Sequence, residues 1–162
     1  MYFCLMKIML LVIGKTDERY LEEGITKYHK RLQHYIPFEI RVIPDIKNRK
    51  TLSEDIQKKM EGELILAQLN AGDELFLLDE NGKSISSRGF SEILNKQALA
   101  GCKRIIFVIG GPYGFSQEVY ERAKAKISLS PMTFSHQMVR LIFVEQLYRA
   151  FTIIKGEPYH HD

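Results

Sequence analysis

The chain has 162 residues, of which 45% are hydrophobic and 27% charged, and its formal net charge is +3. This length fits one domain with a sizeable core, and the composition excludes disordered, collagen-like and disulfide-rich classes. The mildly basic balance permits a nucleic-acid partner without requiring one. The two cysteines, Cys4 and Cys102, have no CxxC spacing, so we expect reduced thiols and a cytoplasmic location rather than a disulfide framework or a zinc site.

The apolar N-terminal run, MYFCLMKIMLLVIGK, lacks the pattern of an export signal. Lys7 interrupts the run, no positive residue precedes it and no small-residue cleavage site follows it. The run is also too short to span a bilayer, so we expect no membrane association. The pattern predicts a buried strand over Lys7–Ile13, an extension without an assigned role over residues 1–5, and a single domain over 1–162.

Strand-like and helix-like segments alternate along the rest of the chain. The first half is predicted to contain a helix over 17–33, a strand over 38–43, a helix over 52–69, and a strand over 74–78 closed by the turn DENGK. The second half is predicted to contain a helix over 90–99, a strand over 104–109, a helix over 116–126, a short strand over 127–130 and a long helix over 136–155.

Continuous apolar strands separated by amphipathic helices indicate an α/β domain with a mostly parallel sheet and helices on both faces. In such sheets, ligands bind beyond the carboxyl ends of the strands. The strand over 104–109 runs into GGPYGFS at 110–116. Because glycine has no Cβ, this loop lets main chain approach a ligand, although a tight turn is the alternative. Its place at the end of a strand favours the ligand.

The last predicted helix, MVRLIFVEQLYRAFTII, is apolar on nearly all sides. Such a helix must be covered all round, which favours a homodimer interface over a core helix of the monomer. Its charged residues are costly to bury unless they are paired or functional. Glu145 and Arg149 have the i, i+4 spacing of a pair. Arg140, nine residues before Arg149, would point to the opposite side of the helix, about half a turn away in azimuth. One of the two arginines is therefore expected to reach a phosphate or a partner subunit.

The spacing of residues excludes several common types of nucleotide-binding, hydrolase and metal site. The segment Gly82-Lys83-Ser84 is not a nucleotide P-loop, because Leu77 stands where the first glycine is required. The glycine-rich dinucleotide motif and the GxSxG elbow of hydrolases are absent from the sequence. His29, His34 and His136 have no ligand partner at helical spacing, so we expect no metal.

A second loop resembles the first in design. The segment SLSPMTFSHQMVR, at 128–140, passes from a short strand through small and polar residues into the last helix, with Ser135 as a plausible N-cap. Two such loops are able to line one pocket with main-chain N–H and C=O groups. An ordinary capped helix start is the alternative.

The segments VIGGPYGFS, SLSPMTFSHQMVRLIFVEQLYRAF, GEPYHHD, MKIMLLVIGK and LLDENGK together resemble the ribosomal RNA large subunit methyltransferase H family of the SPOUT superclass, from Met6 onward. The resemblance implies a homodimer whose C-terminal half forms a deep trefoil knot, which is rare among protein folds. It also implies transfer of a methyl group from S-adenosylmethionine to N3 of a pseudouridine in 23S rRNA, on the assembled ribosome and without a metal.

The resemblance also implies two groups of site residues. The cofactor-binding residues would be Leu78, Gly110, Gly111, Ser130, Pro131, Met132, Thr133, Phe134 and Ser135. Ser135 departs from the family, which usually has proline before the helix histidine. In the catalytic group, His160 would accept or relay the proton, Arg149 would stabilise the anionic base or anchor a phosphate, and Tyr159 would stack on or orient the nucleobase.

Contacts with rRNA are expected from surface cations, because the sequence has no appended RNA-binding domain. The candidates are Lys27, Lys30, Arg31, Lys47, Arg49 and Lys50, for which plain solvated charge is the alternative. Three other functions stay open at this point. They are a SPOUT-type methyltransferase acting on another RNA nucleotide, a non-catalytic dimeric ribosome-binding or RNA-binding module, and an unknotted flavodoxin-like nucleotide binder.

Overall fold

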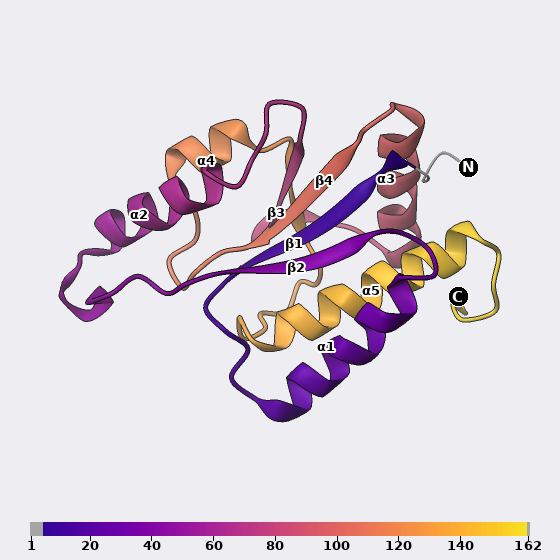
Figure 1. Ribbon diagram of the computed structural model, residues 1–162, viewed down its shortest axis with the longest axis horizontal. Coiled ribbons are helices and arrows are strands. Elements are labelled where there is room, and N and C mark those ends of the chain that lie inside the picture. Colours follow the sequence, from indigo (N-terminus) through magenta and orange to yellow (C-terminus); the bar gives the residue numbers. More distant parts are fainter. Residues whose placement is uncertain (1–4, 162) are drawn as a thin grey trace.

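The computed structural model describes residues 5–161 and shows one sheet with helices on both faces (Figure 1). The sheet consists of β1 (Lys7–Ile13), β2 (Phe38–Ile43), β3 (Glu74–Ser84), β4 (Arg104–Ile109) and β5 (Ala125–Ser128). The helices are α1 (Arg19–Leu32), α2 (Glu54–Leu66), α3 (Ser87–Leu99), α4 (Gln117–Arg122) and α5 (Met138–Ile154), with a 3-10 turn over Arg49–Thr51. Within the described residues, no helix is long and apolar enough to cross a membrane.

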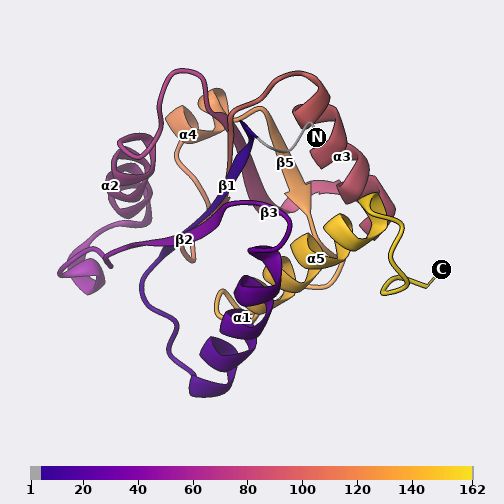
Figure 2. The ribbon, with the colours of Figure 1, turned by 45° about the vertical axis from the view of Figure 1, so that its right-hand side comes forward.

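The strands lie in the order β2-β1-β4-β3-β5, and every neighbouring pair is parallel. Helices α1, α3 and α5 cover one face, while α2 and α4 cover the other (Figure 2). Alternate side chains of a strand point to opposite faces, so Leu10 packs in the α1/α5 cluster and Leu11 in the α2/α4 cluster. The predicted α/β architecture with a parallel sheet is therefore confirmed.

The predicted boundaries are confirmed for β1, β2 and β4, but the helix predicted over 116–126 is too long. Helix α4 ends at Arg122, and β5 already begins at Ala125. The Lys124 N–H donates to the Leu75 carbonyl at 2.8 Å, and β5 then pairs along β3. From Lys124 onward, the backbone therefore forms hydrogen bonds with the edge of β3 instead of continuing the helix that the local sequence predicted.

The turn predicted at DENGK is a bulge within β3 rather than the end of the strand. Leu78 and Lys83 both align with Ile127 of β5, so residues 79–82 arch out of the ladder. Gly82 lies against β5 so closely that an added Cβ would be 2.7 Å from the Lys126 carbonyl carbon. The bulge directs Asp79 and Glu80 toward the carboxyl edge of the sheet.

Helix α5 packs between α1 and α3 and is only partly covered by the single chain. Phe143, Leu147 and Phe151 are buried on its inner side. Ile142 and Ile153, by contrast, are only half-buried. The monomer core thus accounts for the inner half of this apolar helix and leaves the outer half open.

Arg140 is buried, with 3% of its surface exposed, and it ties the start of α5 to the end of β1. Its Nη atoms donate to the carbonyls of Ile13 and Gly14, both at 2.8 Å, and to the Thr16 hydroxyl at 3.2 Å. Burial lowers the pKa of this guanidinium. Of the two arginines considered for phosphate or partner contact, Arg140 is therefore committed to the core.

Replacing Arg140 with leucine removes the donors of two main-chain carbonyls that the guanidinium covers. We expect the free energy of unfolding to fall by about 2–4 kcal/mol, because each abandoned buried acceptor costs about 1–3 kcal/mol. The control is Arg19→Leu, whose side chain is 91% exposed and whose effect should stay within about 0.5 kcal/mol. Urea unfolding at matched protein concentration measures both, and equal midpoints for the two variants would contradict this role.

Candidate functional site

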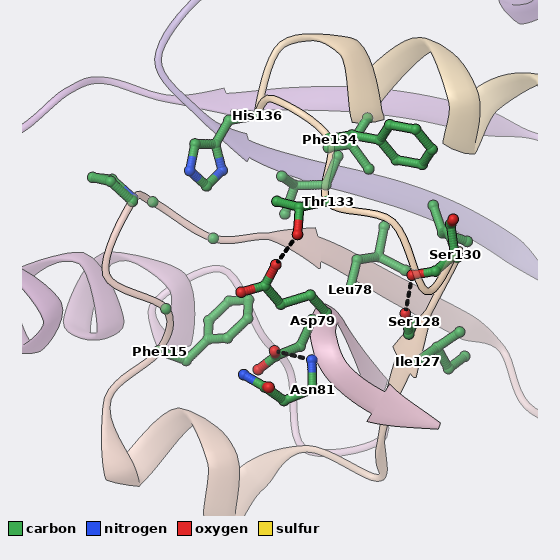
Figure 3. Close-up of a pocket in the computed structure, with 18 of the residues that line it drawn as sticks. Leu78, Asp79, Asn81, Phe115, Ile127, Ser128, Ser130, Thr133, Phe134 and His136 are labelled. Carbon is green, nitrogen blue, oxygen red and sulfur yellow. Dashed lines mark hydrogen bonds between the residues drawn. The ribbon is translucent and has the colours of Figure 1, made fainter. Parts of the chain in front are cut away.

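A cavity of about 430 Å³ opens at the carboxyl ends of β3, β4 and β5 (Figure 3). Its walls come from residues 78–81 after β3, 109–115 after β4, and most of 127–136 after β5. Cavities of roughly 300–1,000 Å³ commonly hold small molecules and cofactors. Parallel pairing places these three segments together, because it aligns the carboxyl ends of neighbouring strands at one edge.

The glycine loop after β4 is both a tight turn and a wall of the cavity. Gly114 has φ +82°, and its N–H donates back to the Gly111 carbonyl at 3.3 Å. Gly110 and Gly111 leave no room for a side chain: an added Cβ would lie 2.9 Å from the Phe115 ring and 2.4 Å from Glu61 Oε2, respectively. The loop is therefore a tight turn and is also suited to ligand binding. Because its glycines have no side chains, it packs closely against Glu61 and Phe115 and exposes main-chain groups to the cavity.

The loop after β5 is held in place by its own hydroxyl groups. Ser128 Oγ donates to the Ser130 carbonyl at 2.8 Å, and Ser130 Oγ accepts from Met132 N–H at 2.9 Å. Ser135 Oγ accepts from Met138 N–H at 3.1 Å, and the Ser135 carbonyl accepts from Val139 N–H at 3.0 Å. The N-cap position of α5 is Gln137 rather than Ser135, but these two bonds hold the turn that leads into the helix.

The β3 bulge contributes two carboxylates to the cavity. Thr133 Oγ1 donates to Glu80 Oε2 at 2.9 Å and so links the bulge to the loop after β5 (Figure 3). The Tyr120 hydroxyl donates to Asp79 Oδ2 at 2.8 Å, and burial followed by this bond raises the pKa of Tyr120. Among residues 5–161 no group of three or more His, Cys, Asp or Glu side chains lies where it could hold a metal ion. The carboxylates instead offer acceptors for hydroxyl or ammonium groups.

Most of the residues expected to hold a cofactor line this one cavity: Leu78, Gly110, Gly111, Ser130, Met132, Thr133 and Phe134. Pro131 and Ser135 belong to the same loop but are not part of the lining. Other polar lining residues were not predicted from the sequence, namely Asp79, Glu80, Asn81, Tyr120 and His136. The signal for Asp79, Glu80 and Asn81 was the polar run directly after an apolar strand, which was interpreted only as a closing turn, whereas Tyr120 and His136 had no comparable signal.

The three residues expected to act in catalysis form a second cluster together with Glu145. We call Glu145, Arg149, Tyr159 and His160 the C-terminal cluster. Arg149 Nη2 lies 2.6 Å from Glu145 Oε1, and the Tyr159 hydroxyl donates to the same oxygen at 3.0 Å. The Arg149 guanidinium carbon lies 4.7 Å from the Tyr159 ring centroid. The expected i, i+4 pair is confirmed, and residues 159–160 are tied down rather than frayed.

Burial and neighbouring groups shift the pKa values of two residues in the C-terminal cluster, Tyr159 and Arg149. Burial, the Tyr28 hydroxyl and the Glu145 carboxylate together raise the pKa of Tyr159, which keeps its phenol protonated. The hydrogen bond from Arg149 to Glu145 raises the pKa of Arg149. Arg149 Nη1 also lies 3.3 Å from His160 Nδ1, and a guanidinium has no acceptor. In this contact Arg149 is therefore the donor and His160 Nδ1 the acceptor.

The cavity and the C-terminal cluster lie at opposite ends of α5. His136 and Val139 line the cavity, whereas Arg149 comes ten residues after Val139. At 1.5 Å per residue, the two positions are about 15 Å apart along the helix axis. Figure 1 shows α5 running away from the loops that follow β4 and β5, with the C-terminal tail beyond its far end. A single chain therefore does not bring the two predicted groups together.

The amino-acid sequence is similar to that of known proteins along almost its whole length. The profile of the family described as "Predicted SPOUT methyltransferase" matches residues 6–160. A protein of Christiangramia forsetii is 64% identical over 156 residues, which cover 96% of this chain and 99% of its own, and one of Flavobacterium johnsoniae is 62% identical with the same coverage. A protein of Parabacteroides distasonis is 62% identical over 157 residues, covering 97% of this chain and 100% of its own. All three carry the name Ribosomal RNA large subunit methyltransferase H. The cavity-lining loops and the C-terminal cluster both lie within the matched range, and the chain belongs to the SPOUT methyltransferase family.

Proposed function

We propose that the protein transfers a methyl group from S-adenosylmethionine to N3 of a pseudouridine in 23S rRNA, within the assembled ribosome of the cytoplasm. Family membership supports methyl transfer, and the names of the relatives support an rRNA substrate. The observation that carries the proposal is the cavity at the carboxyl edge, which two sequence-distant loops and the β3 bulge enclose together.

The residues of the cavity fit the chemistry of the methyl donor. The cofactor has a flat adenine, two ribose hydroxyls, an ammonium and a carboxylate. Asp79 and Glu80 supply acceptors for hydroxyls or the ammonium, and main-chain groups of the two loops supply donors and acceptors for the base. Met132 is 74% exposed and Phe134 37% exposed, so their apolar surface is available to cover adenine. When bound, the cofactor supplies an electrophilic methyl group next to the nucleotide.

The C-terminal cluster suits the nucleotide rather than the cofactor. The imide N–H of a pseudouridine must lose its proton before the nitrogen acts as nucleophile, and a nearby cation favours the resulting anion. Arg149 supplies that cation, and Tyr159 supplies a ring and a protonated hydroxyl for orienting the base. The Nδ1 lone pair of His160 faces Arg149 within the single chain. In this reaction, His160 Nδ1 would accept the proton when Arg149 turns toward the nucleotide.

In the proposed enzyme, a second copy of the chain brings a C-terminal cluster to the cavity that it does not reach within its own chain. Because about 15 Å of α5 lies between Val139 and Arg149, one chain does not offer both a cofactor and a cation to the same nucleotide. A homodimer formed through the half-buried outer side of α5 would place the C-terminal cluster of one subunit at the cavity of the other. We also propose the trefoil knot, which membership of the SPOUT methyltransferase family supports.

The substrate is tested by mass mapping of 23S rRNA from cells with and without this gene. We expect one pseudouridine to lose 14 Da, the mass of one methylene, when the gene is absent, and to regain it when the gene is returned. An unchanged 23S rRNA spectrum, or a lost methyl on another kind of nucleotide, would contradict the proposed substrate.

The shape of the β3 bulge is tested by Gly82→Ala. A Cβ at this position meets the main chain of Lys126 and Ile127, which cannot move aside as a flexible side chain can. The bulge that carries Asp79 and Glu80 should shift, and the dissociation constant for S-adenosylmethionine should rise about tenfold or more, equivalent to about 1.4 kcal/mol. Gly72→Ala is the control, because an added Cβ there meets nothing within 4 Å. Titration calorimetry that gives equal affinities for both variants would contradict the assignment.

The two-subunit site is tested by complementation between variants. His160→Ala should lose turnover while keeping its cofactor affinity, and Gly82→Ala should lose most of its activity at cofactor concentrations near the wild-type dissociation constant. Random re-association of the two variants should restore about a quarter of wild-type activity, because half of the dimers then carry one intact site. If the site lies within one chain, each heterodimer instead keeps one defective copy of each kind, and mixing restores nothing.

A further inference from the structure

Helix α1 carries a stripe of three cations on one side. Lys27, Lys30 and Arg31 have the i, i+3, i+4 spacing of helical neighbours. Lys27 and Lys30 are exposed, and Arg31 is half-buried. Within residues 5–161, none of the three has an acidic side chain within salt-bridge distance. The acid one turn before Lys27, Glu23, is engaged by Arg19 at 3.0 Å.

Aromatic rings join this stripe to the C-terminal cluster. The Arg31 guanidinium carbon lies 5.4 Å from the ring centroids of both Tyr28 and Tyr148. The Tyr148 ring in turn lies 4.8 Å from that of Tyr159. Figure 2 shows α1 and α5 side by side. The two rings hold Arg31 in place before it binds anything, so it loses less conformational freedom on meeting an anion.

We propose that Lys27, Lys30 and Arg31 bind the phosphate backbone of the rRNA next to the nucleotide that is modified. This inference rests on the proposed function, and it names the part of the surface that holds the substrate. Cations without an acidic partner match the charge of a phosphate backbone, and a guanidinium both recognises phosphate and stacks on aromatic rings. The stripe supplies affinity and register, while the C-terminal cluster meets the base.

The other candidate cations fit this role less well. Arg49 is already paired with Asp45 at 3.1 Å. Lys47 and Lys50 lie on the same segment after β2, which Figure 1 places at the opposite end of the molecule from the C-terminal tail. Of the six cations considered from sequence, the three on α1 lie on the helix that packs against α5, and Arg31 is linked through Tyr148 to Tyr159 of the C-terminal cluster.

The test compares two charge-matched double variants. Lys27→Gln/Lys30→Gln removes two charges from the stripe, and Lys58→Gln/Lys59→Gln removes two from α2, on the other face of the sheet. Binding to ribosomes from a strain without this gene is measured by co-sedimentation over a range of KCl concentrations. Each lost contact should weaken binding about fivefold at low salt, since a charge pair at 4 Å in water contributes about 1 kcal/mol. The slope of log affinity against log salt should fall by about 1.4–1.8, and the α2 variant should match the wild type.

Two further measurements separate this inference from the proposed function. Calorimetry with S-adenosylmethionine should give the same affinity for both double variants, and light scattering should give the same mass. Equal ribosome affinities and salt slopes for the two variants would overturn the inference, and so would a change of mass in the α1 variant, because the stripe would then hold a second copy of the chain. If the wild type binds ribosomes with the expected slope but leaves 23S rRNA unmethylated, the proposed reaction fails and the phosphate-binding stripe stands.

Discussion

The parallel pairing of β3 with both β4 and β5 is the constraint on which the candidate site depends. It brings the carboxyl ends of three strands to one edge, although the segments that follow them are far apart in sequence. A different local feature then fixes the conformation of each of the three segments. Glycines let the first loop pack against Glu61 and Phe115, serine hydroxyls hold the second loop, and a bulge turns two carboxylates into the space between them. A cavity of cofactor size results from these packing solutions together.

Helix α5 gives the molecule its second constraint. Arg140 fastens the first turn of the helix to the end of β1, and the buried inner side fixes its direction across the sheet. The helix therefore acts as a rigid spacer between the cavity and the C-terminal cluster. This spacer is about 15 Å long between Val139 and Arg149. In the proposed reaction, the dimer would therefore have a catalytic role as well as a structural one.

Much of the fold was predictable from local pattern, and the failures have physical causes. After their first residues, Lys7 and Arg104, the runs that end at Ile13 and Ile109 are apolar throughout, as is typical of short strands buried on both faces, and the bounds of both strands were predicted correctly. Helix α4 and β5 were misjudged because the open edge of β3 decides where the helix ends, and no local signal encodes that edge. Within the site, the glycines and serines were visible in the sequence. Asp79 and Glu80 were not recognised, because their direction depends on a register shift between two strands.

In the proposed complex, the three segments at the carboxyl edge enclose the cofactor together. Hydrogen exchange measured by mass spectrometry, with and without S-adenosylmethionine, is the decisive test of this arrangement. We expect slower exchange of main-chain amides in residues 79–82, 110–115 and 129–135 at once, with little change around residues 97–104 at the opposite end of the sheet. Protection confined to one of the three segments, or centred on residues 97–104, would contradict it.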